Sequence, residues 1–111
     1  CFEQADAMLT VASTTAVEAM AAGVPVGLVD YLPTAWHLPY DEMDAAVKIS
    51  SAEELTSSIK RLLTDAKLRQ SLRSNASRVI IDELFLCDGN SGTRIVDFLE
   101  ERVPARTDSK L

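Results

Sequence analysis

Short apolar runs and a helical pattern alternate through the first part of the chain. Ala7 to Val11 and Val26 to Val29 are apolar runs of strand length without polar alternation, which indicates strands buried on both faces. Thr15 to Ala22 lies between them and is rich in Ala, and Gly23 follows at the position where a residue after a helix often adopts positive φ. This order predicts a βαβ unit with parallel strands.

The rest of the chain has the pattern of a strand followed by amphipathic helices. Ala45 to Ile49 predicts a third strand, and the stretch "SSAEEL" after it places Ser51 and Glu54 at the spacing of a capping box. Apolar residues then recur at spacings of three and four in three groups: Leu55, Ile59, Leu62 and Leu63; Leu68, Leu72, Ala76, Val79 and Ile80; Ile95, Phe98, Leu99 and Val103. We expect a helix after Ser51, a second from Asp65 to about Leu84, and a last one that closes the domain.

Together these elements predict an α/β fold, a Rossmann-like three-layer domain with a short parallel sheet and C-terminal helices. A chain of 111 residues with 47% apolar content is long enough for one core. We expect one partial domain over residues 1–103 and a loose polar tail over 104–111. Because Cys1 is not an initiator Met and a strand follows almost at once, we interpret the chain as a piece of a longer protein.

Charge is distributed unevenly along the sequence. The first 47 residues hold seven acids and no Lys or Arg, whereas the remainder holds all eleven basic residues against ten acids. This distribution offers no basic face large enough for nucleic acid. No apolar run is long enough to span a membrane, and Cys1 and Cys87 match neither a disulfide framework nor a metal-ligand spacing. We therefore expect a cytoplasmic protein with reduced thiols and no metal.

The irregular stretch "DYLPTAWHLPYDEMD" predicts a shaped loop, because its prolines exclude a regular helix or a central strand. Trp36 in this loop would suit stacking on a base or sugar, but a lone Trp more often covers the edge of a core. His37 would suit an acid, base or phosphate contact, but a lone His more often makes a local hydrogen bond.

The clearest candidate chemistry lies where the first strand meets the first helix. Ser13, Thr14 and Thr15 form a hydroxyl-rich turn before a helix N-terminus, where unpaired N–H groups and the helix dipole favour an anion. Asp30 follows a strand at its carboxyl end, where ligands of parallel sheets collect. No basic residue precedes Lys48, so a cation for this site must come from later in the chain or from a part that is missing.

Glu18 has two interpretations. Thr15 and Glu18 fit the spacing of a capping box, and on spacing alone this structural role is favoured over a ligand contact. The surrounding sequence favours the ligand contact instead, because "ADAMLTVASTTAVEAMAAGVPVGLVDYL" resembles the donor-binding segment of GT-B-type glycosyltransferases. The resemblance continues through "SSAEELTSSIKRLLTDAKLRQSLRSNASRVI" and covers roughly residues 5–100 in order.

The resemblance implies binding of a nucleotide diphosphate sugar, such as a UDP-sugar, for transfer to an acceptor hydroxyl. It implies that Ser13, Thr14 and Thr15 contact the diphosphate and that Glu18 contacts the ribose hydroxyls. The chain is similar to the second half of the C-terminal, donor-binding domain only, so the acceptor site and the catalytic base belong to a missing N-terminal domain and the fragment alone would be inactive. No cofactor is implied beyond the donor substrate.

One position departs from the pattern of many retaining members. Thr10 stands where they carry a second glutamate, so the chain looks more like variants with a Ser/Thr turn among capsule, teichoic-acid and cell-wall transferases. Retention or inversion at the sugar stays open. A role in cell-envelope polysaccharide or glycolipid synthesis follows as an expectation, with a peripheral contact at the inner membrane face. Arg69, Arg73 and Arg78 would suit such a contact with anionic lipid, although their simplest interpretation is a solvated helix face.

Two alternatives stay open. A nucleotide-sugar 2-epimerase shares the fold and a similar turn, and residues upstream would distinguish it. A non-enzymatic α/β interaction module, such as a receiver-like domain, would place acids after its first strand and a phosphoacceptor Asp on a later one. Asp30 and Lys48 resemble that scheme only loosely, because the first strand ends in "VAS" without acids.

Overall fold

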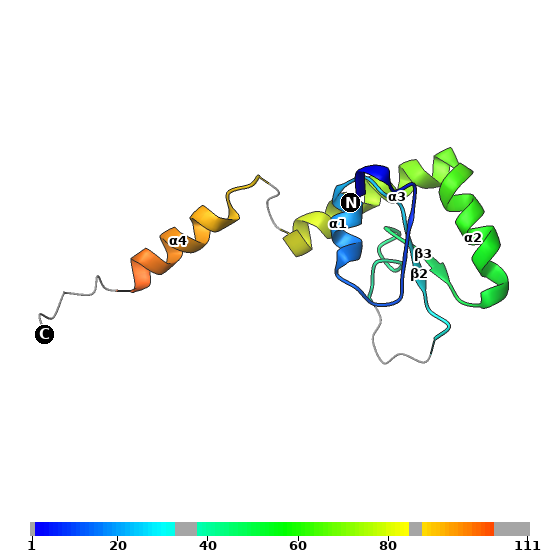
Figure 1. Cartoon of the computed structure of the whole chain (residues 1–111), viewed down its shortest axis with the longest axis horizontal. Coiled ribbons are helices and arrows are strands. Elements are labelled where there is room, and N and C mark those ends of the chain that lie inside the picture. Colours follow the sequence, from blue (N-terminus) through cyan, green and yellow to red (C-terminus); the bar gives the residue numbers. More distant parts are fainter. Residues whose placement is uncertain (1, 33–37, 85–87, 104–111) are drawn as a thin grey trace, which may run out of the picture.

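The protein has an α/β fold, which confirms the predicted fold class. A computed structural model describes residues 2–32, 38–84 and 88–103. Its elements follow in the order η1 (Phe2–Gln4), β1 (Met8–Thr10), α1 (Thr15–Ala21), β2 (Val26–Val29), β3 (Val47–Ile49), α2 (Ala52–Thr64), α3 (Ala66–Leu84) and α4 (Ser91–Arg102) (Figure 1). β2 has the predicted bounds, whereas β1 and β3 are two residues shorter than predicted.

The three strands form a parallel sheet in the order β1-β2-β3. Leu28 at the centre pairs with Thr10 on one side and with Lys48 on the other. Side chains alternate between the two faces of a sheet, so these three residues share one face and their neighbours Leu9 and Gly27 share the other. Below, the carboxyl edge is the edge where the strands end, and the amino edge is the edge where they begin.

Helix α1 covers the face that carries Leu28, and α3 packs over α1. The alanines and the fully covered Val17 of α1 lie in one core with Val26 and Leu28, and Ala76 and Val79 of α3 complete it. Small side chains let the crossover helix lie close to the sheet. Gly23 ends this helix with φ of 76°, as the sequence predicted.

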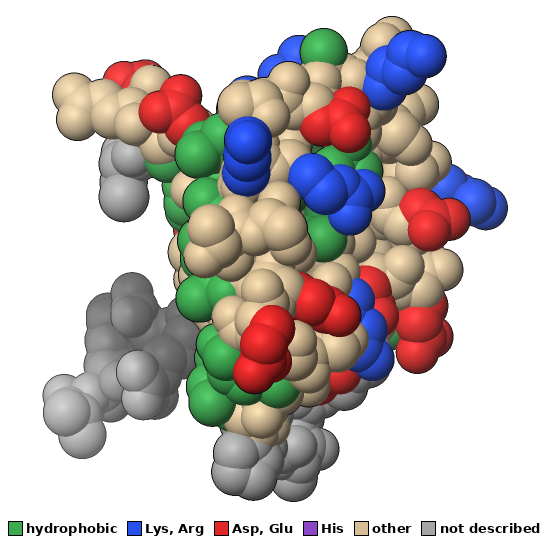
Figure 2. All heavy atoms as spheres, turned by 90° about the vertical axis from the view of Figure 1, so that its right-hand side faces the viewer, with side chains coloured by type: hydrophobic (Ala, Val, Ile, Leu, Met, Phe, Trp, Pro, Cys, Tyr) green, Lys and Arg blue, Asp and Glu red, His purple; other side chains and the backbone are tan. Residues whose placement is uncertain are grey.

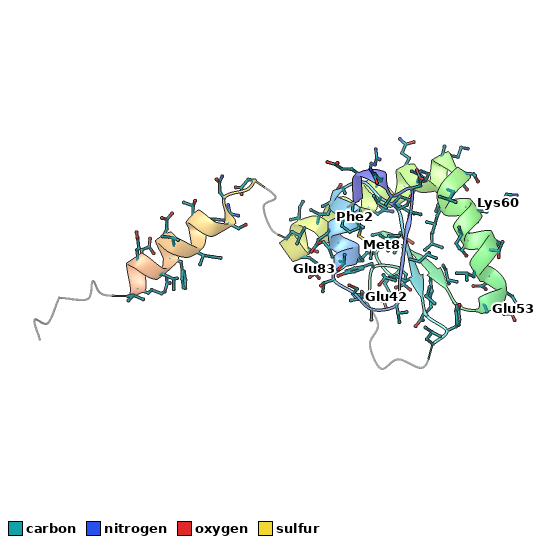
Figure 3. The ribbon with its side chains drawn as sticks, viewed as in Figure 1. Phe2, Met8, Glu42, Glu53, Lys60 and Glu83 are labelled. Carbon is teal, nitrogen blue, oxygen red and sulfur yellow. The ribbon has the colours of Figure 1, made fainter. Side chains whose placement is uncertain are left out.

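Helix α2 covers the opposite face of the sheet. The predicted cap is present, because the Ser51 Oγ accepts from the Glu54 N–H at 3.3 Å. The Glu54 carboxylate reaches back as in a capping box, but it accepts from the N–H of Ser50, one residue before the N-cap, at 3.0 Å. At the other end of α2, Leu62 is fully buried beside Ile49 of β3. Figure 3 shows Glu53 and Lys60 at opposite ends of α2, which therefore runs from the carboxyl edge to the amino edge.

The arginines of α3 make contacts that the sequence did not predict. Arg73 and Arg78 are exposed, as a solvated helix face requires, and Arg69 is half-buried. Arg69 and Arg73 also donate to backbone carbonyls of other elements. Arg69 Nη1 donates to the Leu62 carbonyl at 2.7 Å and to the Asp6 carbonyl at 3.1 Å. Arg73 Nη2 donates to the Gly23 carbonyl at 3.4 Å. These guanidiniums satisfy carbonyls near the C-terminal ends of α2 and α1, where positive charge is stabilising.

The expected packing of the last helix is wrong. Helix α4 forms as predicted, but it lies apart from the α/β body and none of its residues is buried (Figure 1). Phe98 and Leu99 are about half exposed, and the Arg102 guanidinium covers the Phe98 ring at 3.8 Å. The periodicity predicted the helix correctly, but it contains no information on which surface the helix meets.

Asp88 holds the start of α4 in place. Its carboxylate accepts from the Asn90 N–H at 2.9 Å and from Arg94 Nη1 at 2.8 Å, and these bonds lower the pKa of Asp88 below its ordinary value. A carboxyl with a lowered folded-state pKa stabilises structure above its unfolded pKa of about 4, and this contribution is lost as pH falls through the folded value. The first turn of α4 is therefore expected to fray as pH falls below about 4.

The measurement for this prediction is the set of backbone chemical shifts of Ser91–Arg94 as a function of pH. The variant Asp88→Asn should show at neutral pH the frayed shifts that the parent shows in acid. Glu100→Gln, in the exposed part of the same helix, serves as the control and should leave the pH profile of the first turn unchanged. A first turn that stays intact in Asp88→Asn would refute the role of Asp88.

Several predictions fall on residues that the structure does not describe: the loop residues Trp36 and His37, the two cysteines, and the tail over 104–111. Among the described helices, none combines the length and the apolar character needed to cross a membrane.

Candidate functional site

The residues predicted to bind the donor lie along the carboxyl edge of the sheet. The turn Ser13–Thr15 follows β1, Asp30 follows β2, and Ser50 and Ser51 follow β3 into α2. Because the three strands are parallel, the fold brings these segments to one edge, which is where open α/β sheets bind ligands. The N-terminal ends of α1 and α2 lie at this same edge.

The turn before α1 uses several of its own hydrogen-bond donors. The Thr15 N–H donates to the Ser13 Oγ at 3.2 Å, the Ala16 N–H to the Ser13 carbonyl at 3.0 Å, and the Val17 N–H to the Thr14 carbonyl at 3.0 Å. Unpaired N–H groups were predicted for this first turn. The structure shows instead that three of them are already bonded, so an anion here depends on the exposed Thr14 and on exchange of the Ser13 bond.

The capping-box interpretation of Glu18 is wrong. Thr14 is the N-cap of α1 and Thr15 is the first helical residue, so Glu18 is the fourth residue of the helix, one position too far along to close a capping box. The Glu18 side chain is exposed, and within the described part of the chain its carboxylate makes no hydrogen bond or ion pair. Its favourable position in the first turn of the helix dipole is the one structural contribution that remains.

Asp30 and Lys48 form an ion pair at the same edge. The Lys48 Nζ lies 2.8 Å from the Asp30 carboxylate, and this bond raises the pKa of Lys48 above its ordinary value. The pairing of Leu28 with Lys48 puts Lys48 on the face covered by α1, in one row with Thr10. Lys48 is thus a cation near the predicted anion site that the sequence analysis did not assign, since only the strand register reveals its position.

The surroundings of Lys48 are acidic. Asp41 and Glu42, in the segment before β3, act on Lys48 through space and also raise its pKa. Figure 3 places Glu42 toward the end of the molecule that also carries Glu53, at the carboxyl edge. Over residues 2–32, 38–84 and 88–103, no three His, Cys, Asp or Glu side chains gather in a way that would hold a metal ion. A single paired lysine therefore faces several carboxylates at this edge.

Comparison of the chain with known proteins does not identify a family. No protein-family model, curated protein or solved structure matches it. The fold class is established by the parallel order β1-β2-β3 with helices on both faces. The resemblance of residues 5–100 to GT-B enzymes stays a prediction.

The arrangement is chemically suited to a polyhydroxylated ligand. Glu18 offers an exposed carboxylate that accepts hydrogen bonds from vicinal hydroxyls, and Ser13 and Thr14 offer hydroxyl donors one turn away along the chain. The carboxyl edge contains both acceptors for sugar hydroxyls and small donors for an anionic group.

Proposed function

We propose that this chain is the donor-binding part of a GT-B-type glycosyltransferase and holds the nucleotide diphosphate of a nucleotide sugar. The observation that carries the proposal is Glu18, a carboxylate in the first turn of α1 that is exposed and caps nothing. With the capping role removed, a contact to the ribose hydroxyls explains why an otherwise Ala-rich helix carries this acid. The order strand, hydroxyl turn, helix and parallel strand supports the same assignment.

In this proposal the diphosphate lies against the turn Ser13–Thr15. The Ser13 Oγ exchanges its bond to the Thr15 N–H for a phosphate oxygen, which leaves both groups free to donate to the ligand. Hydrogen bonds from hydroxyl and backbone donors stabilise the negative charge that grows on the leaving nucleotide as the acceptor hydroxyl attacks the anomeric carbon. The acceptor site and the catalytic base belong to a separate N-terminal domain.

Lys48 supplies the cation that the turn itself lacks. Thr10 and Lys48 flank Leu28 in one row, so their Cα atoms are two strand spacings, about 10 Å, apart. The Lys48 side chain is 44% exposed, and a diphosphate would compete with Asp30 for its ammonium group.

Titration with nucleoside diphosphates followed by amide chemical shifts tests this proposal, because the method detects millimolar affinities as well as tight ones. UDP is expected to shift the amides of residues 13–18 most. The variant Glu18→Gln should weaken binding about tenfold, as expected for loss of a hydrogen bond to a charged group. Its melting temperature should fall only slightly, because the variant loses just the weak helix-dipole contribution of Glu18.

Glu53→Gln is the matched control, because Glu53 is an exposed acid in the first turn of α2 at the same edge of the sheet. This variant should bind UDP as the parent does. Equal affinity of Glu18→Gln and the parent, together with a lower melting temperature of Glu18→Gln, would mean that Glu18 stabilises the helix only. Absence of shifts in residues 13–18 with every nucleoside diphosphate would refute the donor site.

A further inference from the structure

An open groove of about 650 Å³ lies at the amino edge of the sheet, opposite the candidate donor site. Gly23 and Pro25, between α1 and β2, line one part of it, and Leu63 near the end of α2 lines another. Arg69 and Arg73 of α3 line the groove as well. The groove thus combines apolar walls with two guanidinium groups that come from one helix.

Both guanidinium groups are held in place by backbone carbonyls. Arg69 uses Nη1 for its two bonds, and Arg73 uses Nη2 for its single long bond to Gly23. A Cβ atom on Gly23 would lie only 3.1 Å from the Arg73 Nη2, so the glycine lets the guanidinium rest directly against the backbone. Within residues 2–32, 38–84 and 88–103, neither guanidinium forms an ion pair with a carboxylate. The other guanidinium nitrogens of Arg69 and Arg73 can therefore donate hydrogen bonds to a ligand.

The groove also lies in the most basic part of an acidic protein. Residues 60–73 carry five basic side chains, Lys60, Arg61, Lys67, Arg69 and Arg73, against one acid, Asp65, whereas residues 1–47 carry none against seven acids. Asp65 is occupied with capping α3, where it accepts from the Leu68 N–H at 3.0 Å. Figure 2 shows Lys and Arg side chains concentrated toward the upper part of the face it presents, over the end where α2 meets α3.

We propose that this groove binds a phosphate group through Arg69 and Arg73. The two residues are four apart on one helix, so their Cβ atoms are about 6 Å apart and both forks reach a single phosphate between them. Planar guanidiniums that are already fixed lose little side-chain freedom on binding. Pro25 and Leu63 would contact the organic group that carries the phosphate. This site is independent of the proposed donor site, because it is at the other edge of the sheet.

Titration of the 111-residue chain with inorganic phosphate at constant ionic strength, followed by amide chemical shifts, tests the proposal. Phosphate is expected to shift Gly23, Gln70 and Arg73, and Arg73→Gln should weaken binding about tenfold or more. Arg73→Lys keeps the positive charge but lacks the two-pronged guanidinium, so its affinity for phosphate should lie between those of the parent and Arg73→Gln. Arg78→Gln is the matched control, since Arg78 is an exposed arginine of the same helix outside the groove. Equal far-ultraviolet spectra establish that each variant is folded.

A second arm uses vesicles of phosphatidylcholine with and without phosphatidic acid, which carries a phosphate monoester headgroup. Sedimentation with the phosphatidic acid vesicles that is lost in Arg73→Gln but kept in Arg78→Gln would identify a lipid as the source of the phosphate. Binding of soluble phosphate without sedimentation would identify a soluble ligand. If Arg73→Gln and Arg78→Gln bind phosphate and vesicles equally well, then binding depends only on the net charge of the protein and the groove is not a binding site.

Discussion

Replacement of Leu62 by alanine is expected to lower the free energy of unfolding by about 2–5 kcal/mol, the range for a Leu→Ala change in a packed core. Leu62 is fully buried between α2 and the sheet, where it lies beside Ile49. The layer on this face is thin, because β2 contributes Gly27 there, a residue without a side chain. Few neighbours can therefore move into the space that Leu62 would leave, and most of the cavity should persist.

Urea unfolding followed by circular dichroism measures this loss, provided that the slope of the free energy against urea is unchanged. Leu63→Ala is the matched control, because Leu63 is the next residue of the same helix and its side chain is 46% exposed. This control should cost less than about 1 kcal/mol. Similar losses in the two variants would mean that α2 does not pack on the sheet through Leu62.

A valine at position 27 is expected to destabilise the protein by about 1–3 kcal/mol, the usual cost of overpacking a core. A Cβ atom there would lie 2.7 Å from Leu9 Cδ2 and 3.1 Å from the Cδ1 atoms of Ile49 and Leu62. Leu9 is 41% exposed and has space to turn away, but Ile49 and Leu62 are fully buried. The strand preference of valine over glycine, within about 1 kcal/mol, opposes this clash without cancelling it.

Gly92→Ala provides the comparison for Gly27→Val. Gly92 lies in α4, and a Cβ atom there would meet nothing within 4 Å. Alanine favours a helix over glycine by up to about 1 kcal/mol, so α4 should gain helicity while the urea midpoint of the α/β body stays unchanged. A Gly27→Val protein as stable as the parent would show that α2 lies farther from β2 than the structure places it.

Both stability predictions concern the layer that positions the candidate donor site. Helix α2 packs on β2 and β3, and these strands carry Asp30 and Lys48 at their carboxyl ends. A variant that loosens this layer should therefore also weaken UDP binding if the proposed function holds. Glu18→Gln acts from the other face of the sheet, so its effect on binding should appear with only a small change in the urea midpoint.

Local patterns in the sequence were enough to predict the elements of the fold. The run Val26–Val29, the positive φ of Gly23 and the capping box of Ser51 and Glu54 each depend on residues within a few positions of one another. Such signals depend on neighbouring residues only, so they do not change with the packing of the rest of the chain. The parallel sheet followed from the same patterns, because two strands joined by a helix pair in parallel.

The candidate site was only partly predictable. Ser13, Thr14, Thr15 and Asp30 lie at the carboxyl edge as expected, since parallel strands bring their ends together. The spacing of Thr15 and Glu18 is that of a capping box, yet α1 begins one residue too early for those two residues to form it, because Thr14 and not Thr15 is the N-cap. A single position decides between the two roles of Glu18, and spacing does not fix the first residue of a helix to that accuracy.

By itself the sequence determined which segments are strands and helices and that they form an α/β fold. Only the tertiary structure decided which distant residues meet: Lys48 with Asp30 through the strand register, and Arg73 with Gly23 through the packing of α3 on α1. It also decided that α4 lies apart from the body. The physical reason is that hydrogen bonds within an element connect near neighbours, whereas register and packing depend on contacts between residues far apart in the chain.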